Sequence, residues 1–549
     1  MGAKMLTRRQ FHARLVASFA AAALPMQLRA TVASRADLWL NRLTFGATPE
    51  TRATFDDPMQ WLDAQLAMPA TDVGLEARLA AARLRIVYPA GSDDVTRNWP
   101  GLDELRPLKT LTNDPVDQMH CIDWEQGMDY AERTRPGAEV VAASMIRAVH
   151  APAQLREVMT QFWHDHFNVN AQKDEFTAAF FPSYDAVMRR HAFGNFRALL
   201  GDVARSPAML YYLNNADSRA SPANENWGRE LLELHTLGAG NYLNDLYDDW
   251  KSVPGAADGL AQGYLDLDVY EVARAFTGWS IGDGRYVNDS ENTPKTGRFH
   301  YIEAWHDPYQ KRILGVEFLP NRAPMEDGDQ VMDILAAHPG TARFITTKLI
   351  RRLLTDTPDP AMVNEISAVF LATKDAPDQI AQVIRAIVAH PAFVATPPSK
   401  LRRPFEFMVA LYRATGAEVS STENSFQWQL ARAGWRQHEY GPPTGHPDTA
   451  DKWTGASSLN RLVDYAFYGH DDWFGVARAD LGAIATDGET VDQFVNRWSG
   501  RLGAAPDNLA TAMGVGGGDL VAALSDEDRR GIAAGAIAFA ALSSDFLLR

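Results

Sequence analysis

The chain has 549 residues, a formal charge of −16 and one cysteine, Cys121. A single cysteine excludes an internal disulfide and any metal site built from several cysteines. The acidic excess argues against nucleic acid as a partner, because phosphate binding needs a surplus of basic side chains. With 46% hydrophobic and 22% charged residues, the composition excludes a disordered chain and predicts a globular protein.

The first thirty residues have the pattern of an export signal. Residues 1–30 contain five Lys and Arg and no acidic residue, and a short alanine-rich apolar stretch follows the basic segment. Arg8 and Arg9 fit the pattern that directs folded proteins through the twin-arginine translocase. The alternative is a basic amphipathic helix of a cytoplasmic protein. We expect a twin-arginine signal peptide and a periplasmic or secreted protein, with no transmembrane segment in the mature chain.

Helical periodicity dominates the rest of the chain. Apolar residues recur mostly at helical spacing, strand-like alternation is rare, and no fixed-period repeat is evident. The pattern predicts a mainly α fold: a large helical domain with small β hairpins and long loops. Helices are predicted at about 33–46, 57–68, 72–85, 137–150, 152–168, 175–191, 193–204, 223–237, 268–277, 328–337, 339–354, 359–372, 376–389, 401–415, 456–467, 490–502 and 526–546.

Three regions are expected after the signal peptide. An N-terminal helical region with a long loop covers 31–150, a central helical core covers 151–415, and a C-terminal helical region covers 416–549. The central core contains most of the motifs considered below.

Several segments are predicted to be irregular or extended. Residues 86–135 lack periodicity and indicate a long structured loop. Residues 239–265 are rich in Gly and Asp and indicate a mobile insertion, so deleting 246–259 is expected to leave the fold intact. The strongest strand signal, 299–305, is predicted to pair with 312–318 across a turn.

One histidine stands on the apolar face of a predicted helix. On a helical wheel of residues 152–167, His166 falls within the apolar stripe and His164 falls nearly opposite it. The two imidazoles therefore cannot bind one metal while the helix continues through them. His166 is the candidate of this pair, and the alternative is a core histidine satisfied by one hydrogen bond.

The predicted helix 223–237 has a second polar group on its apolar face. Trp227 marks that face, and Asn224, Gly228 and His235 lie along its edge or within it. Glycine inside a helix costs roughly 1 kcal/mol relative to alanine, so Gly228 indicates close approach by a partner helix or a ligand. Asn224 also suits a helix N-cap. Close packing with caps explains this helix about as well as a functional site does.

Carboxylates on the same helix are candidates for general acid–base catalysis. Glu225 can pair with Arg229 on the outer face, which is ordinary helix chemistry. Glu230 lies on the far border of the apolar face. Either carboxylate is a candidate partner for the histidines.

Because each histidine interrupts the apolar face of its own helix, we expect His166 and His235 to approach one another in the core. Two separate unpaired polar groups would each cost roughly 1–3 kcal/mol. A shared environment, with Asn224 or a nearby carboxylate supplying hydrogen bonds, avoids that cost. Such a cluster suits a divalent metal or proton transfer, so both histidines are candidate metal ligands.

Two further places carry polar residues in suggestive order. Asp268 followed by Glu271 is typical of a capping box, and Arg274 can pair with Glu271. His306 and Asp307 are expected at the end of a strand, where a loop can present them to a ligand. Asp307 before proline is equally typical of an ordinary turn.

Other signals favour structural roles or are weak. His338 and His390 each precede proline between two predicted helices, which indicates a structural role. Asp245, Asp248 and Asp249 only faintly suggest a calcium loop. The chain lacks a phosphate-binding glycine loop, a nucleophile elbow and a His-Glu-x-x-His motif.

Six segments spread over nearly the whole mature chain resemble the motifs of one bacterial family, the domain of unknown function 1800. The Asn224–Gly238 block is the most distinctive of them. The chain departs from the family pattern in its extra length at 239–265 and at His446–Pro447. The six segments are 40–49, 161–169, 224–238, 268–279, His338–Pro339 with Ala342–Ile345 and Lys348–Leu349, and 542–546.

The resemblance implies an exported protein often encoded beside a sulfatase-like protein, which is then a candidate partner, but it carries no activity or cofactor. Two functions are therefore predicted. The first is a hydrolase or lyase acting on an envelope or environmental polymer, with or without a metal. The second is a non-catalytic scaffold or chaperone for a neighbouring exported enzyme. The candidate residues are Glu225, Glu230, His235, His306 and Asp307 for catalysis, Asn224, Trp227, Arg274 and Trp279 for binding, and His166 and His235 for a metal.

Overall fold

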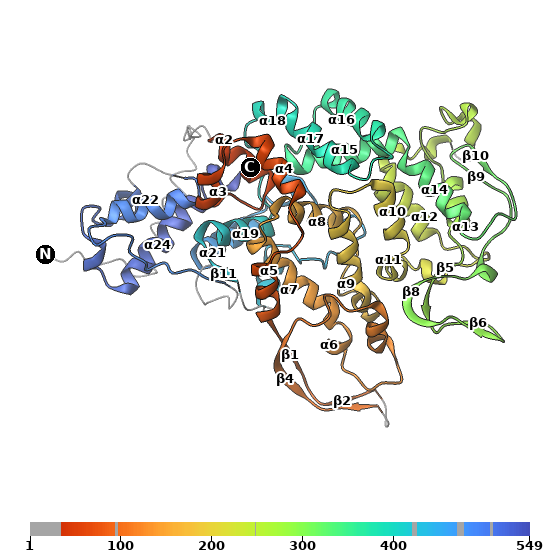
Figure 1. Ribbon diagram of the computed structural model, residues 1–549, viewed down its shortest axis with the longest axis horizontal. Coiled ribbons are helices and arrows are strands. Elements are labelled where there is room, and N and C mark those ends of the chain that lie inside the picture. Colours follow the sequence, from red (N-terminus) through yellow and green to blue (C-terminus); the bar gives the residue numbers. More distant parts are fainter. Residues whose placement is uncertain (1–33, 94–96, 247–248, 420–424, 469–476, 505–508) are drawn as a thin grey trace. The chain divides into compact units, whose positions relative to one another are not determined.

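Helices make up most of the described chain (Figure 1). The structure is a computed structural model and describes residues 34–93, 97–246, 249–419, 425–468, 477–504 and 509–549. Residues Arg35–Arg549 form one compact unit. The expected signal peptide, with Arg8 and Arg9, lies outside the described residues.

The elements follow one another along the chain in three groups. The first comprises α2 (Arg35–Leu43), α3 (Pro49–Thr54), α4 (Pro58–Ala67), α5 (Val73–Ala81), β1 (Arg83–Tyr88), β2 (Gly91–Ser92), β3 (Asn98–Trp99), β4 (Leu102–Pro107), η1 (Pro115–Ile122) and α6 (Tyr130–Arg133). The second comprises α7 (Arg135–His150), α8 (Gln154–His166), α9 (Glu175–Arg190), α10 (Phe196–Ala204), α11 (Pro207–Tyr212), η2 (Asn215–Asp217), α12 (Glu225–Glu230), the π-helical η3 (Leu231–Thr236), η4 (Ala239–Asn241), η5 (Asn244–Leu246), η6 (Trp250–Ser252), η7 (Ala256–Asp258), α13 (Asp266–Ala275), β5 (Trp279–Asp283), β6 (Tyr286–Asn288), β7 (Glu291–Asn292), β8 (Lys295–Tyr301), η8 (Glu303–Trp305), β9 (Lys311–Ile313) and β10 (Val316–Phe318). The third comprises α14 (Glu326–Ala336), α15 (Pro339–Leu353), α16 (Pro360–Ala372), α17 (Gln379–Ala389), α18 (Ala392–Ala395), α19 (Pro404–Thr415), β11 (Glu418–Val419), α20 (Ser425–Arg432), η9 (Ala450–Lys452), α21 (Ala456–Tyr468), β12 (Ala477–Arg478), α22 (Val491–Arg501), α23 (Leu509–Met513), η11 (Val521–Ala523), α24 (Asp526–Ala541) and α25 (Ser544–Leu547).

Each sheet in the described residues is a pair of antiparallel strands. The pairs are β1 with β4, β2 with β3, β5 with β8, β6 with β7, β9 with β10, and β11 with β12. The predicted mainly α fold with small hairpins is therefore confirmed.

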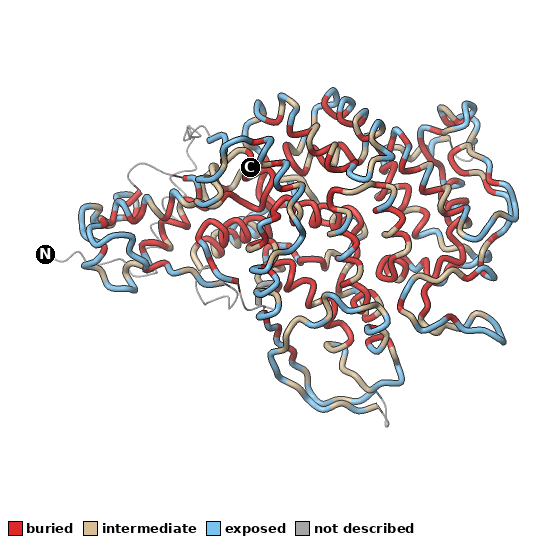
Figure 2. Tube along the Cα trace, in the orientation of Figure 1, coloured by how far each residue is buried: buried red, intermediate tan, exposed pale blue. Residues whose placement is uncertain are grey.

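The centre of the core is formed by α7, α8 and α9, which pack on one another. These helices are buried over most of their length (Figure 2). On α8, Trp163 and Met159 are fully buried. The C-terminal end of α8 therefore opens into a densely packed environment.

Helices α15 and α19 each begin with a proline and a capping hydrogen bond. Pro339 occupies the first turn of α15, and the ring of His338 accepts a hydrogen bond from the Gly340 N–H at 2.9 Å. His338 thus has the structural role that the sequence predicts. Pro404 opens α19, and Glu406 reaches back to the Arg403 N–H at 3.0 Å.

The sequence predicted a long structured loop at residues 86–135, but this range contains strands and short helices. β1 and β4 form a hairpin, and the predicted helix 72–85 ends at Ala81. Leu84 and Ile86 alternate with exposed arginines along β1, which is strand periodicity. The apolar residues before β1 extend the helical pattern into this strand and hide its start.

The predicted pairing of 299–305 with 312–318 is wrong. Residues Lys295–Tyr301 pair with Trp279–Asp283, while β9 and β10 pair with each other. Leu314 and Gly315 both have positive φ and form the two-residue turn that joins β9 to β10. That tight turn leaves the earlier strand to pair upstream.

The segment 239–265 is more packed than its Gly and Asp content predicted. Its described residues form short 3-10 turns, and Val253 and Ala256 are buried. A Cβ on Gly315 would lie only 3.1 Å from the carbonyl oxygen of Ala256. Deleting 246–259 is therefore expected to expose apolar surface, contrary to the prediction from loop closure.

The sequence placed the capping box of α13 one helical turn too late, with Asp268 as the cap and Glu271 as its partner. α13 begins at Asp266, and Asp268 accepts a hydrogen bond from the Leu265 N–H at 2.9 Å. Asp268 is therefore the residue that reaches back rather than the cap itself. The predicted pair of Arg274 with Glu271 is confirmed at 2.9 Å.

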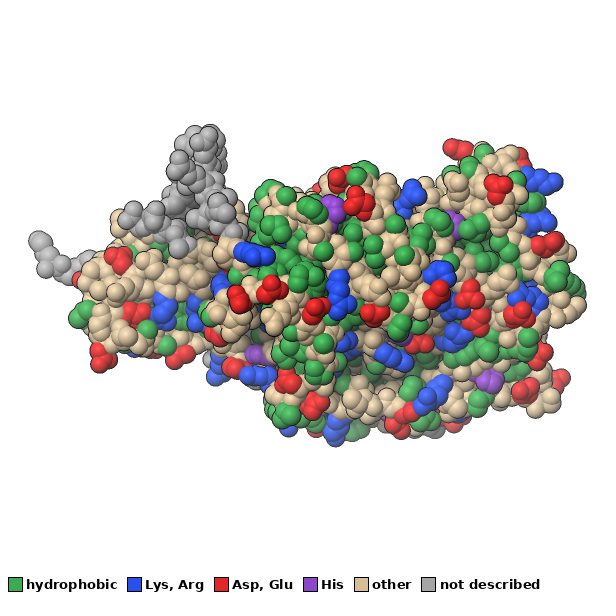
Figure 3. Space-filling view, turned by 45° about the horizontal axis from the view of Figure 1, so that its top comes forward, with side chains coloured by type: hydrophobic (Ala, Val, Ile, Leu, Met, Phe, Trp, Pro, Cys, Tyr) green, Lys and Arg blue, Asp and Glu red, His purple; other side chains and the backbone are tan. Residues whose placement is uncertain are grey.

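Acidic and basic side chains are interspersed on the face of the molecule shown in Figure 3. Within the part of the chain that the structure describes, no helix is long and apolar enough to cross a membrane.

Candidate functional site

His166 and His235 lie side by side in the core, as the sequence predicted. Their ring centroids are 6.2 Å apart, and both residues are fully buried. His166 is the last residue of α8, and its Nε2 donates a hydrogen bond to the backbone carbonyl of His235 at 3.1 Å. Carbonyls at the end of a helix lack an intrahelical partner, so this bond also caps η3.

Lys348 of α15 makes the side-chain contact that the sequence assigned to Asn224 or a carboxylate. Its Nζ lies 2.9 Å from Nδ1 of His166. Because Nε2 of His166 donates to a carbonyl, Nδ1 holds the lone pair and accepts from Lys348. Burial lowers the pKa of His166 well below its usual value, and Lys348 adds to this effect. His166 is thus a neutral imidazole with both nitrogens engaged.

His235 has a different environment. Its ring packs against Phe167 at 5.0 Å and Trp227 at 5.7 Å between centroids. Neither ring nitrogen has a hydrogen-bond partner within the described residues. Burial lowers its pKa to about 3, with Lys348 contributing. The expected sharing of hydrogen bonds by the two side chains was therefore wrong for His235.

The geometry does not support a metal at the two histidines. Among the residues that the structure describes, no three or more His, Cys, Asp or Glu side chains are grouped to hold a metal. The contacts to Lys348 and to the His235 carbonyl occupy both nitrogens of His166.

The weak calcium prediction includes Asp248, which lies outside the described residues.

A cavity of about 260 Å³ lies beside His166. Such a volume accommodates a small molecule or one unit of a polymer. Thr444 at its edge is exposed and Lys348 is half-buried, so the cavity reaches the surface. Four segments far apart in the sequence line it: Phe162, Asp165 and His166 of α8, Lys348, Arg351 and Arg352 of α15, Arg403 before α19, and residues 444–449.

Asp165 and His446 form a hydrogen-bonded pair in the wall of this cavity. Nδ1 of His446 lies 3.3 Å from Oδ1 of Asp165, and Arg403 donates to Oδ2 at 3.0 Å. Burial acts to raise the pKa of Asp165, but Arg403 and His446 hold it well below its usual value. The ionised carboxylate accepts the Nδ1 proton, so Nε2 of His446 carries the lone pair. Nε2 is buried and has no partner among the described residues.

Ring packing and a close backbone approach hold His446 in place. Its ring stacks on Trp435, with centroids 3.7 Å apart and planes 9° from parallel. Gly445 has a φ of +70°, and a Cβ there would lie 1.9 Å from the carbonyl oxygen of Asp165. Only glycine can therefore bring the loop this close to α8.

Arginine and lysine side chains outnumber the carboxylates in the cavity wall. Four cationic side chains line it, against the two carboxylates of Asp165 and Asp448. Behind the wall, Glu406 accepts hydrogen bonds from Arg403 at 3.0 and 3.1 Å and pairs with Arg352. Lys400 lies 3.1 Å from Asp448. The cavity is thus positive inside an acidic protein, which favours an anionic ligand.

Arg351 and Lys348 are the least neutralised of these cations. Within the described residues neither has a carboxylate inside ion-pair distance, and Arg351 donates only to the backbone carbonyl of Asp356, at 3.2 Å. Burial lowers the pKa of Lys348 to about 8. Burial also lowers the pKa of His446, although Asp165 opposes the shift.

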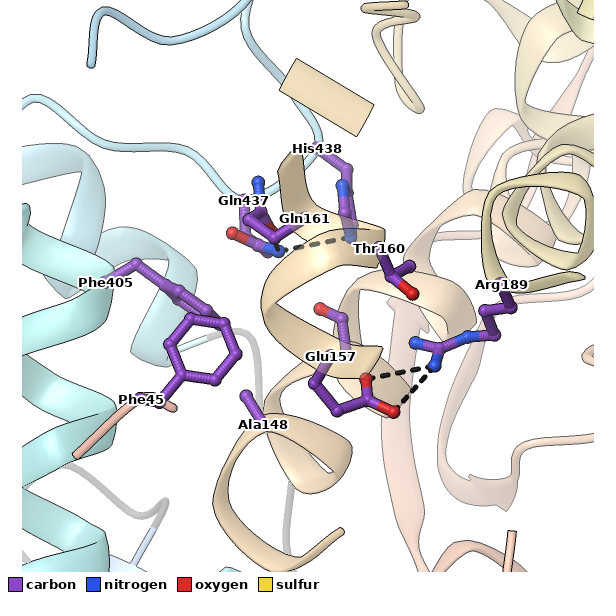
Figure 4. Close-up of a pocket in the computed structure, with 10 residues that line it drawn as sticks. Phe45, Ala148, Glu157, Thr160, Gln161, Arg189, Phe405, Gln437 and His438 are labelled. Atoms are coloured by element: carbon purple, nitrogen blue, oxygen red, sulfur yellow. Dashed lines mark hydrogen bonds and ion pairs between the residues drawn. The ribbon is translucent and has the colours of Figure 1, made fainter. Parts of the chain in front are cut away.

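A second buried polar cluster lies along α8 (Figure 4). Arg189 donates two hydrogen bonds of 2.9 Å to Glu157, and Gln437 donates to Gln161 at 2.6 Å. Gln161 in turn donates to Asp165 at 3.2 Å. The cavity among these residues is only about 10 Å³, room for about one water molecule. We therefore assign this cluster to packing and to support of Asp165.

The predicted residues of α12 do not line the main cavity. Asn224 caps the helix by accepting from the Asn226 N–H at 3.0 Å, as one reading of the sequence predicted. Glu225 is exposed, and Trp227 packs on Phe276. Glu230 is half-buried, and burial raises its pKa.

The residues predicted around His306 also form a separate group. Arg274 binds Asp307 at 2.7 Å, and Nδ1 of His306 lies 3.0 Å from the Thr277 carbonyl oxygen. Trp279 is fully buried. Arg274 and Asp307 are paired with each other, the Trp279 indole nitrogen has no partner among the described residues, and none of these residues lines the main cavity.

Sequence reasoning passed over several residues that the structure brings together. Asp165 and Lys348 lie within segments that resemble the family motifs, but nothing in their spacing relates them to each other. Basic pairs such as Arg351–Arg352 are usually solvated, so they carried no signal. His446 was noted only as a departure from the family pattern.

Comparison with known proteins places the chain in a family. The model of DUF1800, described as a protein of unknown function, matches residues 38–544. No curated protein and no solved structure matches the chain. The family match covers nearly all of the chain beyond the expected signal, including every segment that lines the cavity. The chain therefore belongs to the DUF1800 family of proteins of unknown function.

Proposed function

We propose that this protein is an exported enzyme, a hydrolase or lyase, that acts on an anionic substrate in the cavity beside His166. The observation that carries the proposal is the pairing of Asp165 with His446 in a cavity lined by cationic side chains. Perturbed titratable groups converging on a cavity are typical of catalytic sites.

His446 is the general base of this proposal. Asp165 fixes the tautomer by accepting the Nδ1 proton, which leaves the Nε2 lone pair for a substrate proton. The stack on Trp435 holds the ring in one orientation. An oriented imidazole of this kind contributes roughly 10²–10⁴-fold to a rate.

Arginines supply the complementary charge. Among the described residues the Arg351 guanidinium donates only through Nε, which leaves its outer edge for a ligand, and Arg352 and Arg403 are anchored on Glu406. Guanidinium groups bind carboxylate or phosphate oxygens in pairs and stabilise negative charge that develops next to them. A substrate proton beside a bound carboxylate is therefore the one that His446 can remove.

The lining carboxylates favour a lyase over a glycoside hydrolase. Glycoside hydrolysis commonly needs one carboxylic acid that stays protonated. Arg403 and Lys400 oppose the effect of burial on Asp165 and Asp448, so both pKa values fall, that of Asp448 to about 2. Elimination next to a carboxylate needs a base and a cationic site, and both are present.

The proposed location and substrate source rest on the sequence. Arg8 and Arg9 before a short apolar stretch support export by the twin-arginine route to the periplasm or beyond. An acidic polymer of the envelope or the environment is the substrate class that fits such a location.

The alternative is a scaffold or chaperone for a sulfatase-like exported partner. It is favoured by the many predicted site residues, such as Arg274 and Asp307, that are satisfied by one another. In that case the charged cavity would serve packing alone, and removing its base would change no reaction.

The test is turnover of acidic polysaccharides by the full chain. Polygalacturonate and alginate are the probes, and the ultraviolet absorbance of unsaturated products separates elimination from hydrolysis, which releases reducing ends only. His446→Asn keeps a donor for Asp165 and is expected to lower kcat roughly 10²–10⁴-fold. His120→Asn, at an exposed position, is the matched control.

Thermal unfolding of both variants verifies that the fold is kept. Turnover that is equal in His446→Asn and the unchanged chain would contradict the proposal. Absence of turnover on both polymers, with a sulfatase-like partner stabilised by the protein, would favour the scaffold.

A further inference from the structure

Lys348 is a second reactive group in the same cavity, and the base mechanism does not use it. Its amine contacts Nδ1 of His166, an acceptor that is neutral because its other nitrogen donates to a carbonyl. The neighbouring ring of Phe344 lies 5.4 Å from the amine. The charged groups that act on this amine are Arg351 on the same helix and the carboxylates of Asp165 and Asp448 in the cavity wall.

These surroundings differ from those of two fully buried lysines, Lys311 and Lys400. Lys311 lies 2.7 Å from Asp327, and Lys400 lies 2.6 Å from Asp356, so each ammonium is neutralised by a carboxylate. Within the described residues Lys348 has no such partner inside 4 Å. A desolvated lysine beside another cation is the arrangement that favours a free, nucleophilic amine.

We propose that Lys348 forms a covalent imine with an aldehyde or ketone that carries a carboxylate. The arginines that line the cavity would hold the carboxylate, and the amine would reach the carbonyl carbon. This inference deepens the proposed function and rests on it, because both use one cavity and one anionic substrate class.

The step balances without any further reactant. The amine nitrogen attacks the carbonyl carbon and forms a C–N bond. The carbonyl oxygen then takes the two protons of the amine and leaves as water, which gives the C=N bond. Burial lowers the pKa of Lys348 to about 8, so at pH 8 the free amine is on the order of 100-fold more abundant than at the ordinary lysine value.

Reductive trapping of the full chain tests the imine. The probe is glyoxylate at pH 8 with cyanoborohydride, which reduces an imine to a stable secondary amine. Peptide mass spectrometry then gives the rate of labelling at each lysine. Lys374 is exposed and is the internal reference, and Lys400 is the buried, ion-paired reference.

We expect Lys348 to be labelled at least about tenfold faster than Lys374. Burial lowers the pKa of Lys400 to about 8 as well, but Asp356 and Asp448 hold its ammonium, so Lys400 is expected to remain unlabelled. Acetaldehyde, which has no carboxylate, is expected to lack this preference. Arg351→Gln removes one anion-binding group and also the cation beside the amine, so the readout is the ratio of glyoxylate to acetaldehyde labelling, which is expected to fall. Thermal unfolding of the variant verifies its fold.

Labelling of Lys348 no faster than Lys374 would overturn the imine. An equal preference with both aldehydes would overturn the carboxylate requirement. The two proposals fail separately: turnover that depends on His446 without labelling of Lys348 removes only the imine. Labelling without such turnover removes the base mechanism and leaves the reactive lysine.

Discussion

At the scale of single residues, His166 shows both what a helical wheel can predict and where it stops. Its place on the apolar face of α8 predicts burial and a meeting with His235, and the structure places the two rings 6.2 Å apart. Periodicity relates residues only within one helix. Lys348, 182 positions further on, is therefore invisible to it although its amine contacts His166.

Burial of His235 is expected to make the stability of the protein sensitive to acid. Its pKa falls from 6.5 in the unfolded chain to about 3 in the folded protein because the ring is buried. Between these values the unfolded state binds a proton that the native state does not, so stability falls as pH decreases from about 6.5 to about 3. Lowering the pH from 7 to 5 therefore costs up to about 2 kcal/mol through this residue.

The variant His235→Leu is expected to remove that part of the acid loss. Leucine suits the apolar rings of Phe167 and Trp227 and leaves no ring nitrogen unpaired. Urea unfolding at pH 7 and pH 5 measures the difference, with the exposed His120→Ala as control. An identical acid loss in His235→Leu and the unchanged chain would contradict this account.

At the scale of elements, periodicity located most helices and failed at the sheets. α8 and α15 lie within a few residues of their predicted ranges because long amphipathic helices repeat their pattern several times. The strands of β9 and β10 have three residues each, too few for a pattern to set their register. Turn geometry at Leu314 and Gly315 decided that pairing instead.

Gly445 is the element-scale test of how the cavity loop is held against α8. Gly445→Ala adds a Cβ that overlaps the Asp165 carbonyl and must adopt a positive φ. The expected cost is about 1–3 kcal/mol of unfolding free energy, together with loss of the proposed turnover as His446 is displaced. Denaturant unfolding and the polysaccharide assay measure the two effects.

Gly441→Ala is the matched control for that loop, because a Cβ at Gly441 meets nothing within 4 Å. If both variants behave like the unchanged chain, the close approach of the loop to α8 is wrong.

Gly228 tests the packing of α12 on α13. A Cβ there would lie 2.8 Å from the Val269 carbonyl oxygen, so the space that the sequence offered to a helix or a ligand is taken by a helix. Gly228→Ala is expected to destabilise the protein by about 1–3 kcal/mol, measured by denaturant unfolding.

A glycine-to-alanine substitution at a helix position with open space around it should instead stabilise the protein. Gly531 lies in α24 with nothing within 4 Å, so Gly531→Ala is expected to stabilise by roughly 0.5–1 kcal/mol through helix propensity. Stabilisation by Gly228→Ala would show that the two helices do not touch there.

At the scale of the whole molecule, the candidate site is an assembly of remote segments. Asp165 and His446 are 281 positions apart, and α15 and Arg403 complete the wall. The mainly α class follows from composition and periodicity, whereas the meeting of these segments depends on tertiary packing that no local pattern encodes. For the same reason, the sequence alone does not distinguish a structural ion pair, such as Arg274 with Asp307, from a functional site.

Export is the whole-molecule prediction of the N-terminus. Arg8→Lys combined with Arg9→Lys is expected to hold the protein in the cytoplasm, because the translocase recognises the arginine pair. Cell fractionation and immunoblotting measure the distribution. Unchanged periplasmic recovery of the double variant would remove the argument for this route.

The central claim, that the cavity binds an anionic substrate, is tested most directly by calorimetric titration with the methyl glycoside of galacturonate. Methyl galactoside is the neutral counterpart and differs only in carrying a hydroxymethyl group in place of the carboxylate. The account predicts binding of the acid alone, weakened at least tenfold, or about 1.4 kcal/mol, by Arg351→Gln. Equal affinity for both glycosides, or galacturonoside binding that Arg351→Gln leaves unchanged, would contradict it.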